Sequence, residues 1–261
     1  MSEHPARPHP ASPLLDHWPE TLPSKWYVDP AWHAREIAAI FRREWICIGR
    51  AASFGAGAMR RLDLFGENIV VIRDREGRLA AFHNVCRHRG SELCQHDEKP
   101  LAGKLIVCPY HQWSYDLDGR LVATPHVLRT PDFDRAAHGL FPVALYEWNG
   151  FVFACLADDP PDFAAAPDMG LGALDNWPMA GLAIGHRLVK DLACNWKVFW
   201  ENYNECLHCP GVHPELCDMV PIYRKGIMAP DDDVVLRGEV LQLGGDLVYD
   251  RAARRWVWSA S

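Results

Sequence analysis

Two short stretches decide the fold of this chain: Cys86-Arg87-His88-Arg89-Gly90 and Cys108-Pro109-Tyr110-His111-Gln112-Trp113. Each stretch offers one thiolate and one imidazole. A [2Fe–2S] cluster with two cysteines on one iron and two histidines on the other needs this ligand set, in which each loop gives one ligand to each iron. Structural zinc sites usually leave roughly two to four residues between paired ligands, whereas Cys-x-His leaves one. The four residues therefore predict such a cluster, and a zinc site is the alternative.

The residues around the two stretches predict a small antiparallel β domain between about residues 45 and 156. Short β-branched and aromatic runs alternate there with turn residues, and the predicted strands are 68–73, 78–85, 104–108, 113–117 and 150–156. Glycine in Arg75-Glu76-Gly77 and in Asp118-Gly119 suits the positive φ of a hairpin turn.

The remaining segments predict an N-terminal arm with a helix, a linker and a second domain. Residues 1–44 are expected to form an irregular arm and then a helix from Asp29-Pro30 to about Glu44, with Ile37, Ile40 and Phe41 on one packed face. Residues 157–180 are rich in Pro, Ala, Asp and Gly and predict a loosely packed linker. Residues 181–261 begin a second domain, with a strand near 185–192.

A helix is predicted next in this second domain, with an aromatic stripe toward the core: Trp196, Phe199, Trp200, Tyr203 and Leu207. On the same helix Glu205 and His208 are three residues apart and share a face with Glu201. His213 follows the helix breakers Pro210 and Gly211, so the chain can fold back. Two such histidines suit a ferrous ion bound by two imidazoles and one carboxylate. With Cys206, Cys209 and Cys217 nearby, a mixed Cys/His zinc site is the alternative.

The two cysteine-histidine stretches, with Tyr115-Asp-Leu-Asp-Gly-Arg-Leu121 after them, resemble the Rieske domain of aromatic-ring-hydroxylating oxygenase α subunits. The similarity covers residues 45–156, and its loop between His88 and Cys108 is slightly longer than is usual in the family. Asn195-Trp196-Lys197, Glu201-Asn202-Tyr203, Glu205, His208, His213 and Pro214 resemble the start of the family's catalytic domain. The resemblance implies an α+β fold, in which the β domain precedes the beginning of a truncated helix-on-sheet (helix-grip) domain.

The resemblance also implies a function. Electrons from NAD(P)H would reach the cluster through a separate reductase or ferredoxin and pass to Fe(II) at His208 and His213. There O₂ would be activated to hydroxylate or demethylate a small aromatic or quaternary-ammonium substrate. Glu205 would hydrogen-bond a Rieske histidine of a neighbouring subunit in a homotrimer. Aspartate is usual at this place, and glutamate resembles the carnitine and glycine-betaine branch.

The third iron ligand is not identified in this sequence. In the family it is an aspartate well over a hundred residues after the histidines, whereas the chain ends forty-eight residues after His213. The downstream aspartates are Asp218, Asp231, Asp232, Asp233, Asp246 and Asp250. Three interpretations stay open: a fragment of a longer oxygenase, a reduced protein completed by a local aspartate or a partner, and a Rieske ferredoxin-like electron carrier. A zinc-binding interaction module is a further alternative.

The composition narrows the class of protein. A net charge of −7 gives no basic excess for nucleic acid, and no apolar run is long enough to span a membrane or to form a signal peptide, so a soluble cytoplasmic protein is expected. Nine cysteines are an odd number, and a chain of 261 residues is large enough to fold without cross-links, so no disulfide framework is expected. Cys47, Cys94, Cys155 and Cys194 are expected to be small buried hydrophobes.

Overall fold

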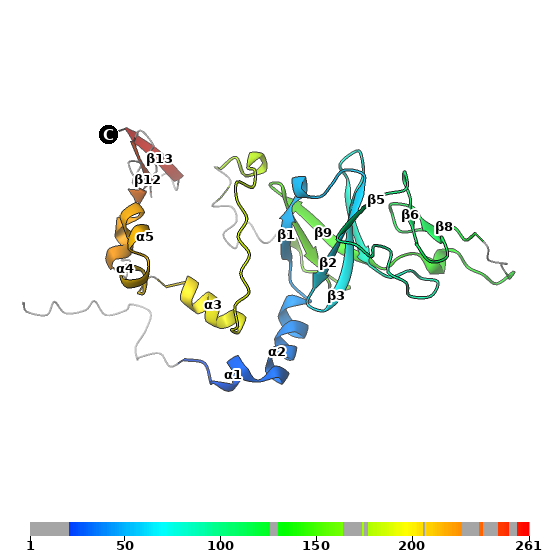
Figure 1. Cartoon of the computed structure of the whole chain (residues 1–261), viewed down its shortest axis with the longest axis horizontal. Coiled ribbons are helices and arrows are strands. Elements are labelled where there is room, and N and C mark those ends of the chain that lie inside the picture. Colours follow the sequence, from blue (N-terminus) through cyan, green and yellow to red (C-terminus); the bar gives the residue numbers. More distant parts are fainter. Residues whose placement is uncertain are drawn as a thin grey trace, which may run out of the picture.

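The computed structural model describes residues 21–125, 130–163, 174, 177–205 and 207–225, together with the backbone of three later strands at 235–236, 245–250 and 255–260. The expected arm at residues 1–20 lies outside the described residues. Figure 1 shows two β-rich parts at opposite ends of the molecule, with short helices between them.

An antiparallel sheet of seven strands forms the larger part, in the order β1-β10-β9-β4-β3-β2-β5. Its strands are β1 (Ile46–Arg50), β2 (Ala58–Leu64), β3 (Glu67–Arg73), β4 (Leu79–His83), β5 (Glu98–Pro100), β9 (Pro142–Trp148) and β10 (Phe151–Cys155). Residues of β3 alternate between two cores, because successive side chains of a strand point to opposite faces. Ile69 and Val71 pack with Val152 on one face, and Val70 and Ile72 pack on the other.

A second antiparallel sheet of three strands lies beside the first and consists of β6 (Ile106–Val107), β7 (Ser114–Tyr115) and β8 (Leu121–Ala123). Its residues Ile106 and Tyr115 share the core of Val70 and Ile72. The antiparallel β domain is thus present, and each of the five predicted strands overlaps an observed one. The sequence pattern missed β1, β2, β5, β8 and β9.

The N-terminal helical region is shorter and less regular than predicted. It comprises α1 (Lys25–Val28), α2 (Pro30–Glu36) and the π-helical turn η1 (Ile37–Phe41). Asp29 caps α2 as expected, since its carboxylate accepts a hydrogen bond from the backbone N–H of Ala31. The predicted packed face is wrong in part, because Ile40 is 41% exposed while Glu36 is only 8% exposed.

Residues 182–195 run as an extended segment that forms no strand, so the prediction of a strand at 185–192 is wrong. Its apolar side chains, including Leu188 and Val189, are exposed. Three helices follow: α3 (Trp196–Tyr203), α4 (Cys209–Val212) and α5 (Pro214–Met219). The aromatic stripe of α3 does not face a core either. Tyr203 is 68% exposed and Trp200 46%, and the helix is held at its first turn, where Trp196 of the stripe and its neighbour Lys197 bind Glu36.

The C-terminal strands β11 (Val235–Leu236), β12 (Gly245–Asp250) and β13 (Arg255–Ala260) form an antiparallel sheet in that order. Together with the helices and the β domain they make an α+β fold, as predicted. The linker is partly described. There Phe163 is buried against Trp45 and Tyr146, so its first residues pack more closely than expected. Among the described helices, none has the length and apolar character needed to span a membrane.

Candidate metal centres

The first ligand loop follows β4 and is a tight turn. The backbone N–H of Gly90 donates to the carbonyl of Cys86, at 3.0 Å, and the N–H of Cys86 donates to the carbonyl of Ser91. Gly90 has φ +73°, a conformation that costs glycine little because it has no Cβ. Cys86 and His88 therefore both lie within this one turn.

The second ligand loop joins β6 to β7. The N–H of Cys108 donates to the carbonyl of Trp113 at 2.9 Å, and the N–H of Gln112 donates back to the carbonyl of Cys108. Gln112 has φ +59°, which closes the turn after His111. The two loops thus share one design, in which a cysteine begins a hydrogen-bonded turn and a histidine stands at its tip.

The four predicted ligand side chains come together between these loops. The Cys86 and Cys108 thiols are buried, at 2% and 1% exposure, and contact each other. The imidazole rings of His88 and His111 lie with centroids 4.8 Å apart. The Nδ1 atom of His88 is buried without a hydrogen-bond partner in the described part of the chain. A buried unpaired nitrogen is costly, and a metal ion would satisfy it.

Burial is the main cause of the pKa shifts of these side chains. Burial raises the pKa of the Cys86 thiol, and the neighbouring Cys108 raises it further. Burial lowers the pKa of His88, which is also close to His111 and Arg89, so the imidazole is neutral as a ligand must be. Across the described residues no three His, Cys, Asp or Glu side chains gather around one point, and a cluster with two protein ligands per iron needs none.

Two aromatic residues enclose this candidate cluster site. The Tyr115 hydroxyl lies 3.3 Å from the Cys86 sulfur and accepts a hydrogen bond from the backbone N–H of Arg87 at 3.1 Å. Since its oxygen serves Arg87 as acceptor, its proton is available to the sulfur. Trp113 stacks on His88, with centroids 4.6 Å apart and planes 9° from parallel.

Asn84 is a supporting residue that the sequence analysis missed. Its buried side-chain oxygen accepts hydrogen bonds from the backbone N–H groups of Leu93 and Cys94, each at 2.9 Å. Its amide nitrogen donates to Asn68 Oδ1 and to the Cys94 carbonyl. Asn84 thereby ties together both ends of the first ligand loop. An asparagine two residues before a ligand cysteine was the only available signal.

The second predicted constellation lies beyond α3 rather than on it. The helix ends at Tyr203, Glu205 stands in the connection, His208 precedes α4 and His213 lies between α4 and α5. The prediction that Glu205 and His208 share a helix face is wrong, because the backbone leaves the helix at Asn204. The rings of His208 and His213 are nevertheless close, with centroids 5.3 Å apart.

Glu205 is bound to the first of these histidines. Its Oε1 lies 2.6 Å from His208 Nδ1, and its Oε2 accepts from the backbone N–H of Leu207. The hydrogen bond with His208 is the main cause that lowers the pKa of the Glu205 carboxyl. An ionised carboxylate only accepts, so His208 carries its proton on Nδ1 and keeps a lone pair on Nε2 for a metal.

Other predicted neighbours of this pair do not join it. Glu201 accepts a hydrogen bond from the Tyr27 hydroxyl at 2.6 Å, and Asp218 pairs with Arg224. Asp231, Asp232, Asp233 and Cys206 lie outside the described residues, and only the backbone of Asp246 and Asp250 is described. The arrangement thus offers two imidazoles and one supporting carboxylate, with no assigned third ligand.

The cysteines outside the cluster site divide into two groups. Cys94 and Cys155 are buried as predicted, whereas Cys47 and Cys194 are exposed. Cys47 is exposed because it lies on β1, the edge strand of the large sheet, and Cys194 because it lies in the extended segment before α3. Cys209 and Cys217 are buried close to the histidine pair.

Comparison with protein-family models gives two matches along this chain. Residues 44–134 match the Rieske [2Fe-2S] domain, and residues 179–254 match the catalytic domain of the ring hydroxylating α subunit. The two domains imply a [2Fe–2S] cluster and a mononuclear iron as cofactors.

Curated relatives match more than three quarters of this chain. The glycine betaine monooxygenase oxygenase subunit of Chromohalobacter salexigens is 42% identical over 209 residues, which are 78% of this chain and 45% of the relative. The carnitine monooxygenase oxygenase subunit of Escherichia coli is 35% identical over 210 residues, 78% of this chain and 55% of the relative. The chain therefore spans about half the length of the curated relatives it matches.

A solved structure shares the fold. The quaternary ammonium Rieske monooxygenase in complex with γ-butyrobetaine superposes with a TM-score of 0.62 at 32% identity, over 74% of this chain and 56% of the other. The similarity reaches from the β domain past the linker, since it covers more of the chain than the β domain alone.

Proposed function

Since this chain belongs to the family of Rieske ring-hydroxylating oxygenase α subunits, we propose that it is the oxygenase component of a monooxygenase for a small quaternary-ammonium compound. Its electrons come from NAD(P)H through a separate reductase or ferredoxin. The substrate class is inferred from the relatives, whose names are glycine betaine, carnitine and choline monooxygenases.

The meeting of two buried thiols with two adjacent imidazoles is the observation that carries this proposal. Cys86 and Cys108 are proposed to hold one iron of the [2Fe–2S] cluster, and His88 and His111 the other. The unpaired, buried Nδ1 of His88 supports its role as a ligand. When bound, this cluster supplies single electrons, and the mononuclear iron supplies the position at which O₂ is activated.

The residues around each centre have distinct roles in this proposal. Tyr115 donates its hydroxyl proton to the Cys86 sulfur, which stabilises negative charge there. His208 and His213 hold the mononuclear iron through their free ring nitrogens, and Glu205 orients His208 by accepting its Nδ1 proton. The third ligand is unassigned: Asp218 is paired with Arg224, and the side chains of the other downstream aspartates lie outside the described part of the chain.

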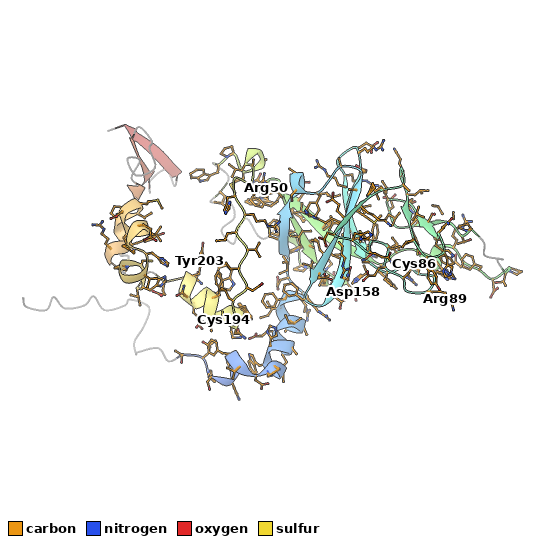
Figure 2. All side chains as sticks on the ribbon, in the orientation of Figure 1. Arg50, Cys86, Arg89, Asp158, Cys194 and Tyr203 are labelled. Atoms are coloured by element: carbon orange, nitrogen blue, oxygen red, sulfur yellow. The ribbon has the colours of Figure 1, made fainter. Side chains whose placement is uncertain are left out.

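The positions of the two centres favour an assembly of several subunits. Cys86 lies in the β-rich part toward one end of the molecule, and Tyr203, the last residue of α3 before Glu205, lies toward the other (Figure 2). Electron transfer over the length of one subunit would be slow, so a neighbouring subunit is proposed to bring its cluster near this iron. A homotrimer is the proposed assembly, with Glu205 as the bridge between the centres.

Metal analysis with EPR spectra of protein purified without air tests the proposal. About three irons and two sulfides per chain, with a Rieske signal, support the oxygenase. Two irons with the same signal support an electron carrier without the mononuclear site, and zinc without a Rieske signal supports an interaction module. Turnover of glycine betaine, carnitine and choline with a reductase and NADH then tests the substrate class.

A further inference from the structure

Glu36 is a buried carboxylate that belongs to neither of the two candidate metal centres. It stands at the end of α2 and is 8% exposed. Both of its oxygens are bound to the start of α3: Lys197 Nζ lies 2.5 Å from Oε1, and Trp196 Nε1 donates to Oε2 at 2.9 Å. Lys197 is also buried, at 9% exposure. A buried ion pair thus joins two helices that are 160 residues apart in sequence.

Further contacts strengthen the same junction. The Phe41 ring meets Trp196 edge-on, with centroids 5.2 Å apart. The Tyr27 hydroxyl of α1 donates to Glu201, one turn further along α3. The N-terminal helices therefore hold α3 at its first turn and again at its second.

The N-terminal helical region also contacts the seven-stranded sheet of the β domain. Phe41 stacks on Phe65 in the turn between β2 and β3, with centroids 4.8 Å apart. Arg42 donates to the Phe65 carbonyl at 3.1 Å and pairs with Glu67 at 2.9 Å. The N-terminal helices thus connect the turn of the sheet directly to the first residues of α3.

A buried ion pair is poor evidence for stability, because removing two charges from water costs about as much as their attraction returns. Its better attested use is to specify one geometry among several. Here the specified element is α3, which ends at Tyr203, two residues before Glu205 and five before His208. Trp200 and Tyr203 are exposed, so among the described residues the N-terminal helices supply the main contacts of α3.

We propose that Glu36 is a positioning residue for the mononuclear site: through Lys197 and Trp196 it holds α3, and with it Glu205 and His208, at a set place relative to the Rieske domain. This inference rests on the proposed oxygenase function for its catalytic consequence. The anchoring of α3 itself does not depend on that function.

Hydrogen exchange on the full chain with its cofactors, purified without air, tests the anchoring. In Glu36→Gln the Lys197 ammonium keeps its burial and loses its counter-charge, so amides 196–203 are expected to exchange roughly tenfold faster or more. Amides of β2, β3 and β4 and the Rieske EPR signal are expected to stay unchanged. The double variant Glu36→Gln/Lys197→Gln removes both charges and can keep hydrogen bonds, so it should return α3 to within roughly threefold of wild type.

The matched control is Glu76→Gln, which breaks the exposed pair with Lys104. It should leave the amide exchange rates unchanged, both in α3 and in the β domain. Equal acceleration of all amides in Glu36→Gln would overturn the proposal, since it would mean a loss of overall stability only, and so would unchanged exchange in α3.

The ratio of product formed to O₂ consumed tests the catalytic consequence. It should fall several-fold in Glu36→Gln, recover in the double variant and stay at the wild-type value in Glu76→Gln. An unchanged ratio in Glu36→Gln would overturn the positioning role. If wild type forms no product and binds no mononuclear iron, the proposed function fails, and the exchange measurement still decides whether Glu36 anchors α3.

Discussion

Glu205 Oε1 and His208 Nδ1 lie 2.6 Å apart, and both residues belong to the connection between α3 and α4. The contact selects the tautomer of His208 that has its free lone pair on Nε2. A carboxylate in this position also makes the imidazole a stronger ligand, as in other metal sites with a carboxylate behind the histidine.

We expect Glu205→Ala to weaken Fe(II) binding at the mononuclear site by roughly tenfold or more, since His208 loses the group that orients it. Glu205→Gln should fall between this variant and wild type, because its carbonyl oxygen can still accept the proton. Titration of Fe(II) into protein depleted of the mononuclear iron measures this. Glu215→Ala, an exposed acid in the first turn of α5, is the control. Equal Fe(II) affinity in wild type, Glu205→Ala and Glu205→Gln would contradict the role assigned to Glu205.

Tyr115→Phe is expected to lower the reduction potential of the cluster. The hydroxyl stabilises the more negative, reduced state, so a hydrogen bond worth about 1 kcal/mol more to that state corresponds to roughly 40 mV. Redox titration followed by circular dichroism measures the shift. Tyr146→Phe removes a hydroxyl on β9 from a ring that packs against Trp45 and Phe163, and should leave the potential unchanged. A potential that does not move in Tyr115→Phe would show that the proton is not directed at Cys86.

Asn84→Ala should lower both stability and cluster content. The change leaves the backbone N–H groups of Leu93 and Cys94 buried without their acceptor, at a cost of about 2 kcal/mol or more. Iron and sulfide content after purification and the thermal midpoint report the two effects. Asn68→Ala removes one hydrogen bond of the same network and should have a smaller effect. Full cluster occupancy in Asn84→Ala would mean that the loop forms without this support.

The effect of Glu36→Gln on α3 should depend on pH. Burial alone would raise the pKa of the Glu36 carboxyl, but hydrogen bonds from Lys197 and Trp196 together hold it below its usual range. A carboxyl with a lowered pKa stabilises the folded arrangement above its ordinary pKa of about 4.3, and this stabilisation is lost as the pH falls through the lowered value. His33, whose Nδ1 lies 3.8 Å from Oε2, lowers the pKa of the Glu36 carboxyl a little further.

The ratio of α3 exchange rates, variant over wild type at the same pH, is the measurement for this dependence. It should be large at pH 7 and approach one in acid, where wild type is itself neutral at position 36. A ratio that stays constant with pH would mean that the charge of Glu36 is not what holds Lys197.

The sequence by itself was enough to predict the candidate cluster site. Cys86, His88, Cys108 and His111 were predicted because each pair belongs to one short turn, whose geometry is set by its own backbone hydrogen bonds and by residues such as Gly90. The strands that carry the two loops were predicted from short β-branched and aromatic runs between turn residues. Such features depend on neighbours in sequence, which a pattern can show.

Tertiary structure alone decided the features that depend on distant residues. The helix with Trp196 was predicted with its aromatic stripe inward, yet it is held by Lys197 and Trp196 on Glu36, so Tyr203 is exposed. Glu205 was placed on that helix, yet the backbone leaves it at Asn204 and the carboxylate still reaches His208. A buried charge is placed by its partner, and this partner is 161 residues away, so no local pattern of the sequence could reveal it.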